Sequence, residues 1–119
     1  MKLLTADIRK QLLRNGRLHQ QCDETGEEKL DFMPLVKLFT PDAGCTWLLT
    51  EIDPDDPDIA FGLCDLGMGY PELGSVSLSV LEALRGRLNL PVERDLCFTA
   101  TKPLSAYADE ARAHGAIKA

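Results

Sequence analysis

Three runs rich in Val, Ile, Phe, Trp and Leu follow one another in the middle of the chain, at residues 35–40, 46–52 and 59–66. Each run is bounded by Pro, Gly or Asp clusters, a pattern typical of strands separated by turns. The links, residues 41–44 and 53–58, are too short for the crossover of about a dozen residues that parallel neighbours need. The sequence therefore predicts an antiparallel sheet that the rest of the chain covers.

Both faces of these strands carry apolar side chains. Successive side chains of a strand point to opposite faces, so residues 46–52 place Trp47 and Glu51 on one face and Leu48 and Ile52 on the other. A sheet that is apolar on both sides needs cover on both sides. Helices of this chain or a partner protein can supply the second layer.

The N-terminal segment predicts an amphipathic helix. Thr5 is suited to cap a helix over residues 6–15, and Gly16 follows as a C-terminal stop. Residues 18–29 are polar and have no clear period, which predicts a loop. His19 falls in this loop, and no neighbour in the sequence orients its ring.

The second half of the chain predicts short elements separated by turns. We expect, in order, a glycine-rich bend leading to an extended segment at residues 67–77, a short helix that starts at a capping box of Ser79 and Glu82 and ends at Gly86, a last strand at residues 96–99, and a helix at residues 106–114. Ser105 is the expected cap of the final helix and Gly115 its stop. That helix has little apolar surface, so we expect it to be loose.

These elements define an α+β fold. We expect residues 1–105 to form a single domain with an antiparallel sheet of about four or five strands, an N-terminal helix and a short helix after Ser79. Residues 106–119 are expected to form a loose C-terminal helix or a frayed tail. A chain of 119 residues with 45% hydrophobic content can bury a sizeable core without disulfides or a metal.

The spacing of the cysteines and the length of the apolar stretches indicate where in the cell the protein is expected. The four cysteines are far apart and form no C-x-x-C pair: Cys22, Cys45, Cys64 and Cys97. Free thiols are therefore expected, with no metal and no other cofactor. No leader segment and no stretch of membrane-spanning length is visible, which predicts a cytoplasmic protein without a membrane partner.

The net charge of −6 is unevenly distributed along the chain. Residues 1–20 carry five basic side chains and one acid, whereas residues 21–72 carry thirteen acids and two lysines. Phosphate contacts need a cationic surface, so direct nucleic-acid binding by the sheet is not expected. The acidic part is either a solvated surface, a binding surface for a basic partner, or a mimic of DNA.

Catalytic residues are not evident in the sequence. The two histidines, His19 and His114, fall in a predicted loop and a predicted helix end, where rigid positioning is not favoured. Glu51 and Asp53 share a strand face and are suited to acid-base chemistry or to a hard cation. They equally fit a polar strand end that leads into an acidic turn.

Three segments match one known family in order and spacing: LFTPDAGCTWLLTEIDPDD from residue 38, IAFGLCDLGMGYPELGSVSLSVLEALRG from residue 59, and LNLPVERDLCF from residue 88. The chain resembles the family catalogued as domain of unknown function 2958 from residue 3 to about residue 104. The resemblance rests on Phe39-Thr40-Pro41, Trp47, Thr50-Glu51, Phe61-Gly62-Leu63, Glu72-Leu73-Gly74, Leu84-Arg85-Gly86 and Glu93-Arg94-Asp95. It implies a small bacterial protein, often associated with plasmids or other mobile elements, and no particular activity. The chain departs from the family pattern at Cys45 and at Cys64-Asp65.

The favoured hypothesis is a non-enzymatic accessory protein that binds a protein partner. Its expected binding surface consists of Trp47, Glu51, Asp53, Asp55, Asp56, Tyr70 and Glu72. Trp47 is either an interface anchor or a core residue. One alternative is an acidic inhibitor that mimics DNA and blocks a nucleic-acid-binding or defence enzyme. Another is a small carboxylate- or metal-dependent hydrolase, which requires that Glu51, Asp53, Glu72 and Glu93 line one pocket.

Overall fold

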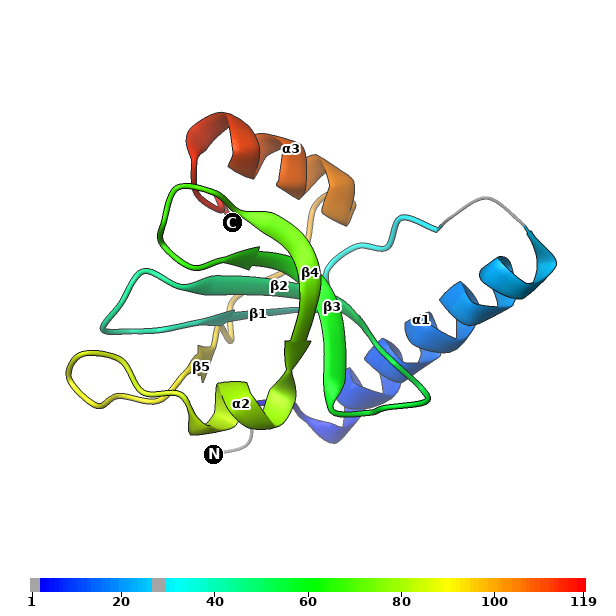
Figure 1. Ribbon diagram of the computed structural model, residues 1–119, viewed down its shortest axis with the longest axis horizontal. Helices are drawn as coiled ribbons and strands as arrows, with labels where there is room; N and C mark the ends of the chain where they lie inside the picture. Colours follow the sequence, from blue (N-terminus) through cyan, green and yellow to red (C-terminus); the bar gives the residue numbers. More distant parts are fainter. Residues whose placement is uncertain (1–2, 27–29) are drawn as a thin grey trace.

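The computed structural model of the chain describes residues 3–26 and 30–119. Within them the elements run in the order α1 (Ala6–Thr25), β1 (Val36–Phe39), β2 (Thr46–Ile52), β3 (Ile59–Asp65), β4 (Glu72–Ser77), α2 (Leu78–Ala83), β5 (Glu93–Arg94) and α3 (Leu104–His114). The described strands form one antiparallel sheet in the order β4-β3-β2-β1-β5. The predicted α+β fold is confirmed, and Figure 1 shows the helices arranged around the sheet.

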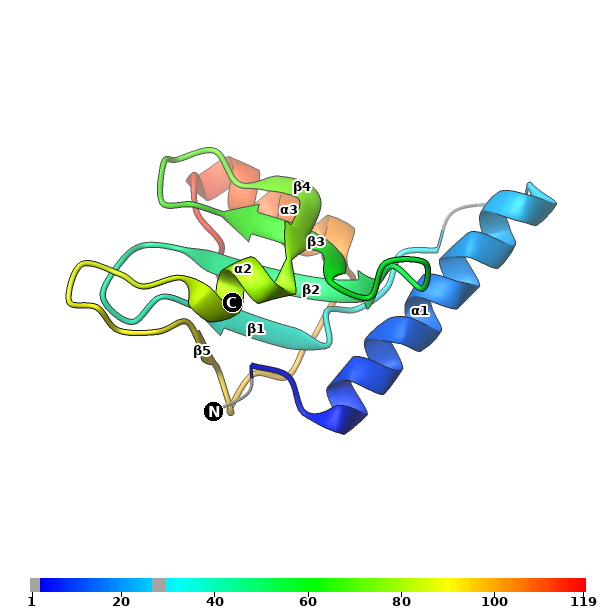
Figure 2. The ribbon, with the colours of Figure 1, turned by 60° about the horizontal axis from the view of Figure 1, so that its bottom comes forward.

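Helices of the chain itself cover both faces of the sheet. One buried cluster joins Leu12 of α1 and Leu81 of α2 to the β2 side chains of Trp47 and Leu49. Leu48 belongs to a second cluster with Leu63 of β3 and with Leu104, Tyr107, Ala108 and Ala111 of α3. The ribbon views place α2 and α3 on opposite sides of the sheet (Figures 1 and 2). Among the described residues, none of the helices combines the length and the hydropathy of a membrane-spanning segment.

Helix α1 is longer than the sequence pattern predicts. Thr5 caps it as expected, with the hydroxyl accepting from the Ile8 backbone N–H at 3.1 Å. The helix then continues through Gly16 and ends at Gly26, whose φ of 71° is the left-handed conformation of a helix C-cap. The predicted loop is therefore wrong for residues 18–25, while residues 27–29 lie outside the described residues.

Gly16 allows α1 to pack closely on β2 and does not end the helix. A Cβ atom built on Gly16 lies 1.9 Å from the backbone oxygen of Ile52. A contact that short is sterically forbidden, so only glycine allows α1 to approach the end of β2 this closely. The close approach is the reason that a residue typical of helix ends lies inside a helix.

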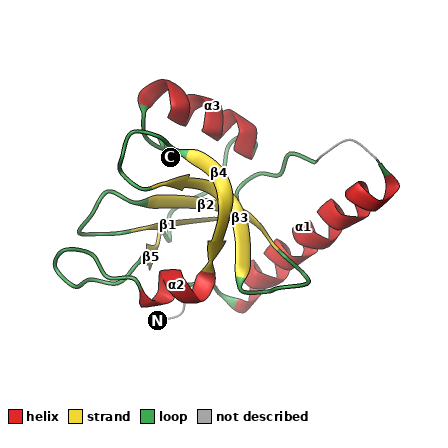
Figure 3. Cartoon of the chain, viewed as in Figure 1, coloured by secondary structure: helices red, strands yellow, loops and turns green. Residues whose placement is uncertain are grey.

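The later elements start at residues other than those predicted. The cap of α2 is the Ser77 hydroxyl, which accepts from the Val80 N–H, so Ser79 lies inside the helix. The last strand is Glu93–Arg94 instead of residues 96–99, because the Asp95 carboxylate accepts from the Cys97 N–H and turns the chain. Helix α3 has Pro103 at its N-cap instead of Ser105. Figure 3 shows the resulting elements along the chain.

Asp58 joins the β2–β3 turn to the start of α2. Its carboxylate accepts from the Ser77 hydroxyl at 2.5 Å, the Ser79 N–H at 2.9 Å and the Ser79 hydroxyl at 3.0 Å. The Ser77 hydroxyl and then the Ser79 backbone N–H lower the pKa of Asp58, because they stabilise its ionised form.

We expect Gly16→Ala to lower the free energy of unfolding by about 1–3 kcal/mol, because the added methyl group overpacks the contact with Ile52. In an unpacked helix the same change raises stability by about 1 kcal/mol. The measurement is chemical denaturation. Gly74→Ala is the control, since its Cβ meets no atom within 4 Å. Equal or higher stability of Gly16→Ala contradicts the close approach.

We expect the Asp58 carboxyl to titrate below an aspartate in an unfolded peptide of the same local sequence. A carboxyl whose pKa is lowered by folding stabilises the fold above its unfolded pKa, and this contribution is lost as pH falls through the folded pKa. Carbon-detected NMR titration from neutral pH to about pH 2 measures the midpoint. Ser77→Ala is expected to raise the midpoint, and an unchanged midpoint contradicts the assigned cause.

Candidate functional site

A β-bulge lies at the centre of the site. Strand β2 pairs regularly with β3 up to Leu49, and the register then shifts before Glu51. Thr50 is the extra residue, and it is buried at 2% exposure. Bulges often occur beside functional sites, because they redirect the side chains that follow.

The bulge places Glu51 on the α3 side of the sheet. Leu49 and Ile52 belong to the same buried cluster, beneath α1 and α2, although they are three positions apart. Glu51 precedes Ile52 and therefore points to the opposite face, where its register partner Phe61 packs against the α3 cluster. The prediction that Glu51 shares a face with Trp47 is wrong, because strict alternation does not account for the extra residue.

One face of α1 contacts β2 at this bulge. The Asn15 side-chain amide donates to the backbone oxygen of Thr50 at 2.9 Å. That carbonyl lies in the bulge, and Asn15 satisfies it, which removes the cost of a partly buried unpaired acceptor. His19 follows one turn after Asn15 and therefore lies over Glu51.

His19 and Glu51 form a close side-chain pair. The two carboxylate oxygens lie 3.0 and 2.9 Å from the His19 Nδ1 atom. The side chains are 31% and 13% exposed, respectively, so the pair is partly withdrawn from water. A carboxylate only accepts hydrogen bonds, so Nδ1 carries a hydrogen and donates it to Glu51. Nε2 is an acceptor when the ring is neutral and a donor toward Asp23 when the ring is protonated. Glu51 thus fixes both the orientation and the tautomer of His19.

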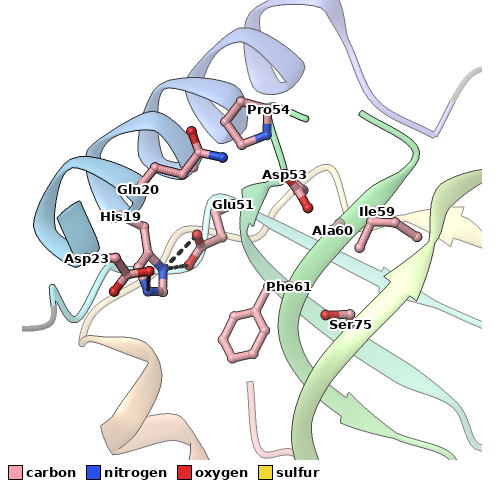
Figure 4. Close-up of a pocket in the computed structure, with 11 residues that line it drawn as sticks. His19, Gln20, Asp23, Glu51, Asp53, Pro54, Ile59, Ala60, Phe61 and Ser75 are labelled. Carbon is pink, nitrogen blue, oxygen red and sulfur yellow. Dashed lines mark hydrogen bonds and ion pairs between the residues drawn. The ribbon is translucent and has the colours of Figure 1, made fainter. Parts of the chain in front are cut away.

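Asp23 lies on the other side of the imidazole ring, one helical turn further along α1. Its Oδ2 atom is 3.7 Å from His19 Nε2, which is too far for a hydrogen bond. The Asp23 side chain is 63% exposed. Figure 4 shows the ring between the two carboxylates.

These side chains line an open cleft of about 220 Å³ between α1 and the sheet. Its walls include His19, Asp23, Glu51, Asp53, Phe61 and Ser75 (Figure 4). A neighbouring groove of about 360 Å³ shares three of these residues and adds Asp31, Phe32 and Leu73. Among the described residues that line either hollow, the ionisable ones are four carboxylates and one histidine, with no lysine or arginine.

The structure brings part of the predicted binding surface to this cleft. Glu51 and Asp53 line it. Asp55 does not line it but accepts from the side-chain amide of Gln20, a lining residue, at 3.0 Å. Asp56 instead shapes the acidic turn, by accepting from the Asp58 N–H at 3.3 Å.

The other predicted surface residues lie elsewhere. Trp47 is 2% exposed and belongs to the core, so its side chain is not an interface anchor. Tyr70 is 81% exposed in the β3–β4 loop. Glu72 begins the edge strand β4 and Glu93 lies on β5 at the opposite edge. The four carboxylates required for the hydrolase alternative therefore do not line one pocket.

The described residues show no cluster arranged to hold a metal ion, and one of the four cysteines is held in an unreactive form. Across residues 3–26 and 30–119, no three His, Cys, Asp or Glu side chains are placed to hold a metal ion. The cysteines are free, as predicted. Burial raises the pKa of the Cys64 thiol to about 11, so this thiol is protonated and unreactive near neutral pH.

The sequence reasoning missed His19, Asn15 and Phe61 as site residues. Asn15, His19 and Asp23 are spaced four residues apart, which is the spacing of neighbours on one helix face. Continuing the helix through Gly16 reveals this face. Its contact with Glu51 is not visible in the sequence, because the two residues are 32 positions apart.

Comparison with known proteins assigns the chain to a family of unknown function. Residues 3–118 match the family described as Protein of unknown function (DUF2958), so the chain belongs to it, as the resemblance indicated. No curated protein and no solved structure matches the chain.

We expect the neutral imidazole of His19 to carry its hydrogen on Nδ1, because Glu51 accepts there. Long-range ¹H–¹⁵N NMR spectra distinguish the two tautomers. Glu51→Ala is expected to abolish the preference, whereas Glu24→Ala, which removes an exposed acid from the same helix, keeps it. A native ring protonated on Nε2 contradicts the geometry of the pair.

Proposed function

We propose that this protein is a non-enzymatic accessory protein that binds a basic segment of a protein partner in the cleft between α1 and the sheet. The observation that carries the proposal is the lining of the cleft and the neighbouring groove. Asp23, Glu51, Asp53 and Asp31 supply negative charge, and no described lining residue is a lysine or arginine. A concave surface with one sign of charge concentrates ligands of the opposite sign.

The two hollows together suit an extended segment better than a compact small molecule. They share His19, Glu51 and Phe61, so they form one continuous surface. The groove adds apolar side chains, including Phe32 and Leu73. Charged positions in the cleft and apolar positions in the groove match a peptide that carries both kinds of side chain.

The charge distribution of the whole chain supports this proposal. Residues 21–72 carry thirteen acids against two lysines. Long-range attraction between this segment and a basic partner speeds encounter, and its effect weakens as salt increases. The proposal includes a cytoplasmic location and, as the family resemblance implies, an association with bacterial mobile elements.

We expect a natural host extract to contain a protein that the native chain retains and that Asp23→Lys/Asp53→Lys does not, because the substitution makes the cleft repel a cation. The control is Glu82→Lys/Asp109→Lys, which makes the same charge change on exposed residues outside the cleft. Affinity capture followed by cross-linking mass spectrometry identifies the retained protein and its contact segment.

The control variant is expected to retain the partner, and the cross-links are expected to join the cleft to a lysine- or arginine-rich segment. Equal retention by both charge-reversed variants, with circular dichroism showing both folded, contradicts the proposal. Duplex DNA added as a competitor tests the acidic-inhibitor alternative. Displacement of the partner by DNA favours that alternative over ordinary association.

A further inference from the structure

Strand β4 leaves one edge of the sheet without a partner. It is the outermost strand of the order β4-β3-β2-β1-β5, and Figure 1 shows it at the front of the sheet with no described element in front of it. An edge strand presents a row of backbone N–H and C=O groups with which another chain can pair. The opposite edge is β5, which has two residues and therefore offers little to pair with.

The hydrogen-bonding pattern of β4 shows which of its backbone groups are open. The Leu78 N–H donates to the Asp58 carbonyl oxygen at 2.7 Å, directly beyond the last pair of the β3–β4 register. In an antiparallel ladder, pairs that exchange backbone hydrogen bonds alternate with pairs that do not. Gly74 therefore bonds to β3, whereas Leu73 and Ser75 turn their N–H and C=O groups outward. In the described chain, no backbone hydrogen bond from outside the sheet reaches these groups.

Strand β4 lacks the features by which natural sheets block such an edge. Lysine or proline on the edge strand, or a bulge in it, commonly prevents pairing with another chain. The strand sequence ELGSVS contains neither residue type, and β4 pairs with β3 without a register shift. A Cβ built on Gly74 in the middle of the strand meets no atom within 4 Å, so β4 is also uncovered on that face. The edge is therefore accessible to an added strand.

The open edge runs beside the acidic cleft and the neighbouring groove. The side chains of Leu73 and Ser75 lie on the face of the sheet that α3 covers, because their register partners Leu63 and Phe61 lie in or against the α3 cluster. Ser75 lines the cleft, and Leu73 lines the groove. A strand added to β4 therefore places every second side chain beside these two hollows.

The charge of the hollows determines which side chains suit these positions. The described ionisable lining residues are four carboxylates and one histidine, with no lysine or arginine. Basic side chains on that face of an added strand extend over β4 toward the carboxylates, which attract them. This charge complementarity favours a basic segment over the β4 strand of a second copy, whose one charged residue is the acid Glu72.

We infer that the basic segment of the partner binds as an added strand along β4, with alternate basic side chains directed toward the cleft and the groove. This inference rests on the proposed function and adds to it the conformation of the bound segment. The backbones of Leu73 and Ser75 each supply one donor and one acceptor to the segment. Backbone pairing of this kind gives affinity, and the hollows beside the edge give the preference for basic side chains.

The test uses a short fluorescently labelled peptide in which lysine alternates with valine. Every second N–H of an added strand faces the sheet edge, so two further peptides carry N-methyl groups on the lysine nitrogens of the backbone alone or on the valine nitrogens alone. Fluorescence anisotropy measures the affinity of each peptide for the native protein. Methylation of one set is expected to weaken binding about tenfold or more, the effect of roughly two lost hydrogen bonds, and methylation of the other set to have little effect.

Two variants at one position locate the pairing. Ser75→Pro removes an N–H that does not bond to β3, so the fold tolerates it, and peptide affinity is expected to fall about fivefold or more. Ser75→Ala is the matched control, because it keeps the N–H and removes only the hydroxyl, and it is expected to bind as the native protein does. Circular dichroism checks that both variants fold. If Ser75→Pro unfolds, the methylated peptides on the native protein still decide the inference.

The outcomes separate this inference from the proposed function. If methylation of the two sets has the same effect, and Asp23→Lys/Asp53→Lys still abolishes binding, the added strand is wrong and the basic-partner function stands. A native dimer in analytical ultracentrifugation that Ser75→Pro dissociates shows that a second copy occupies the edge, which also overturns the inference. Failure of the unmethylated peptide to bind the native protein contradicts both the added strand and the proposed function.

Discussion

The close approach of α1 to the end of β2 is the constraint on which the rest of the site depends. Gly16 permits it, because a side chain at that position occupies the space of the Ile52 carbonyl. Asn15 stabilises it by satisfying the backbone oxygen of Thr50. With the helix held this close, His19 lies directly over the residue that follows the bulge. The contact between the backbones of α1 and β2 thus determines where the ionisable side chains of the site lie.

The bulge at Thr50 determines on which side of the sheet Glu51 lies. It allows Leu49 and Ile52 to face the same core while Glu51 turns to the opposite side of the sheet. A regular strand would place Glu51 beside Trp47 in the buried apolar cluster, where an unpaired carboxylate is costly. The bulge instead pairs Glu51 with His19 at a partly exposed position. The fold thereby avoids a buried charge and gains an oriented imidazole.

The three central strands were predictable and the site was not, for reasons that particular residues show. The turns at residues 41–44 and 53–58 are short and rich in Pro, Gly and Asp, so the antiparallel pairing of β1, β2 and β3 followed from local signals, whereas the pairing of β5 with β1 did not. Gly16 was misleading, because Asn-Gly is typical of helix ends and its tight contact is with a distant strand. Thr50 carries no local mark of a bulge, and the His19–Glu51 contact joins residues 32 positions apart. Asp58 likewise shifted the start of α2 from the expected capping box to Ser77 through contacts across a turn.

The placement of charge links the fold to its proposed use. Acids that look dispersed in the sequence converge where β2 ends, and helix α1 contributes His19 and Asp23 to the same cleft. The most direct measurement is a series of ¹H–¹⁵N NMR spectra of the protein titrated with the lysine–valine repeat peptide. The account predicts that the largest shifts fall on the cleft residues His19, Asp23, Glu51 and Phe61 and on β4. Shifts concentrated on the exposed β3–β4 loop around Tyr70, with those four residues unchanged, would show that the cleft is not the binding site.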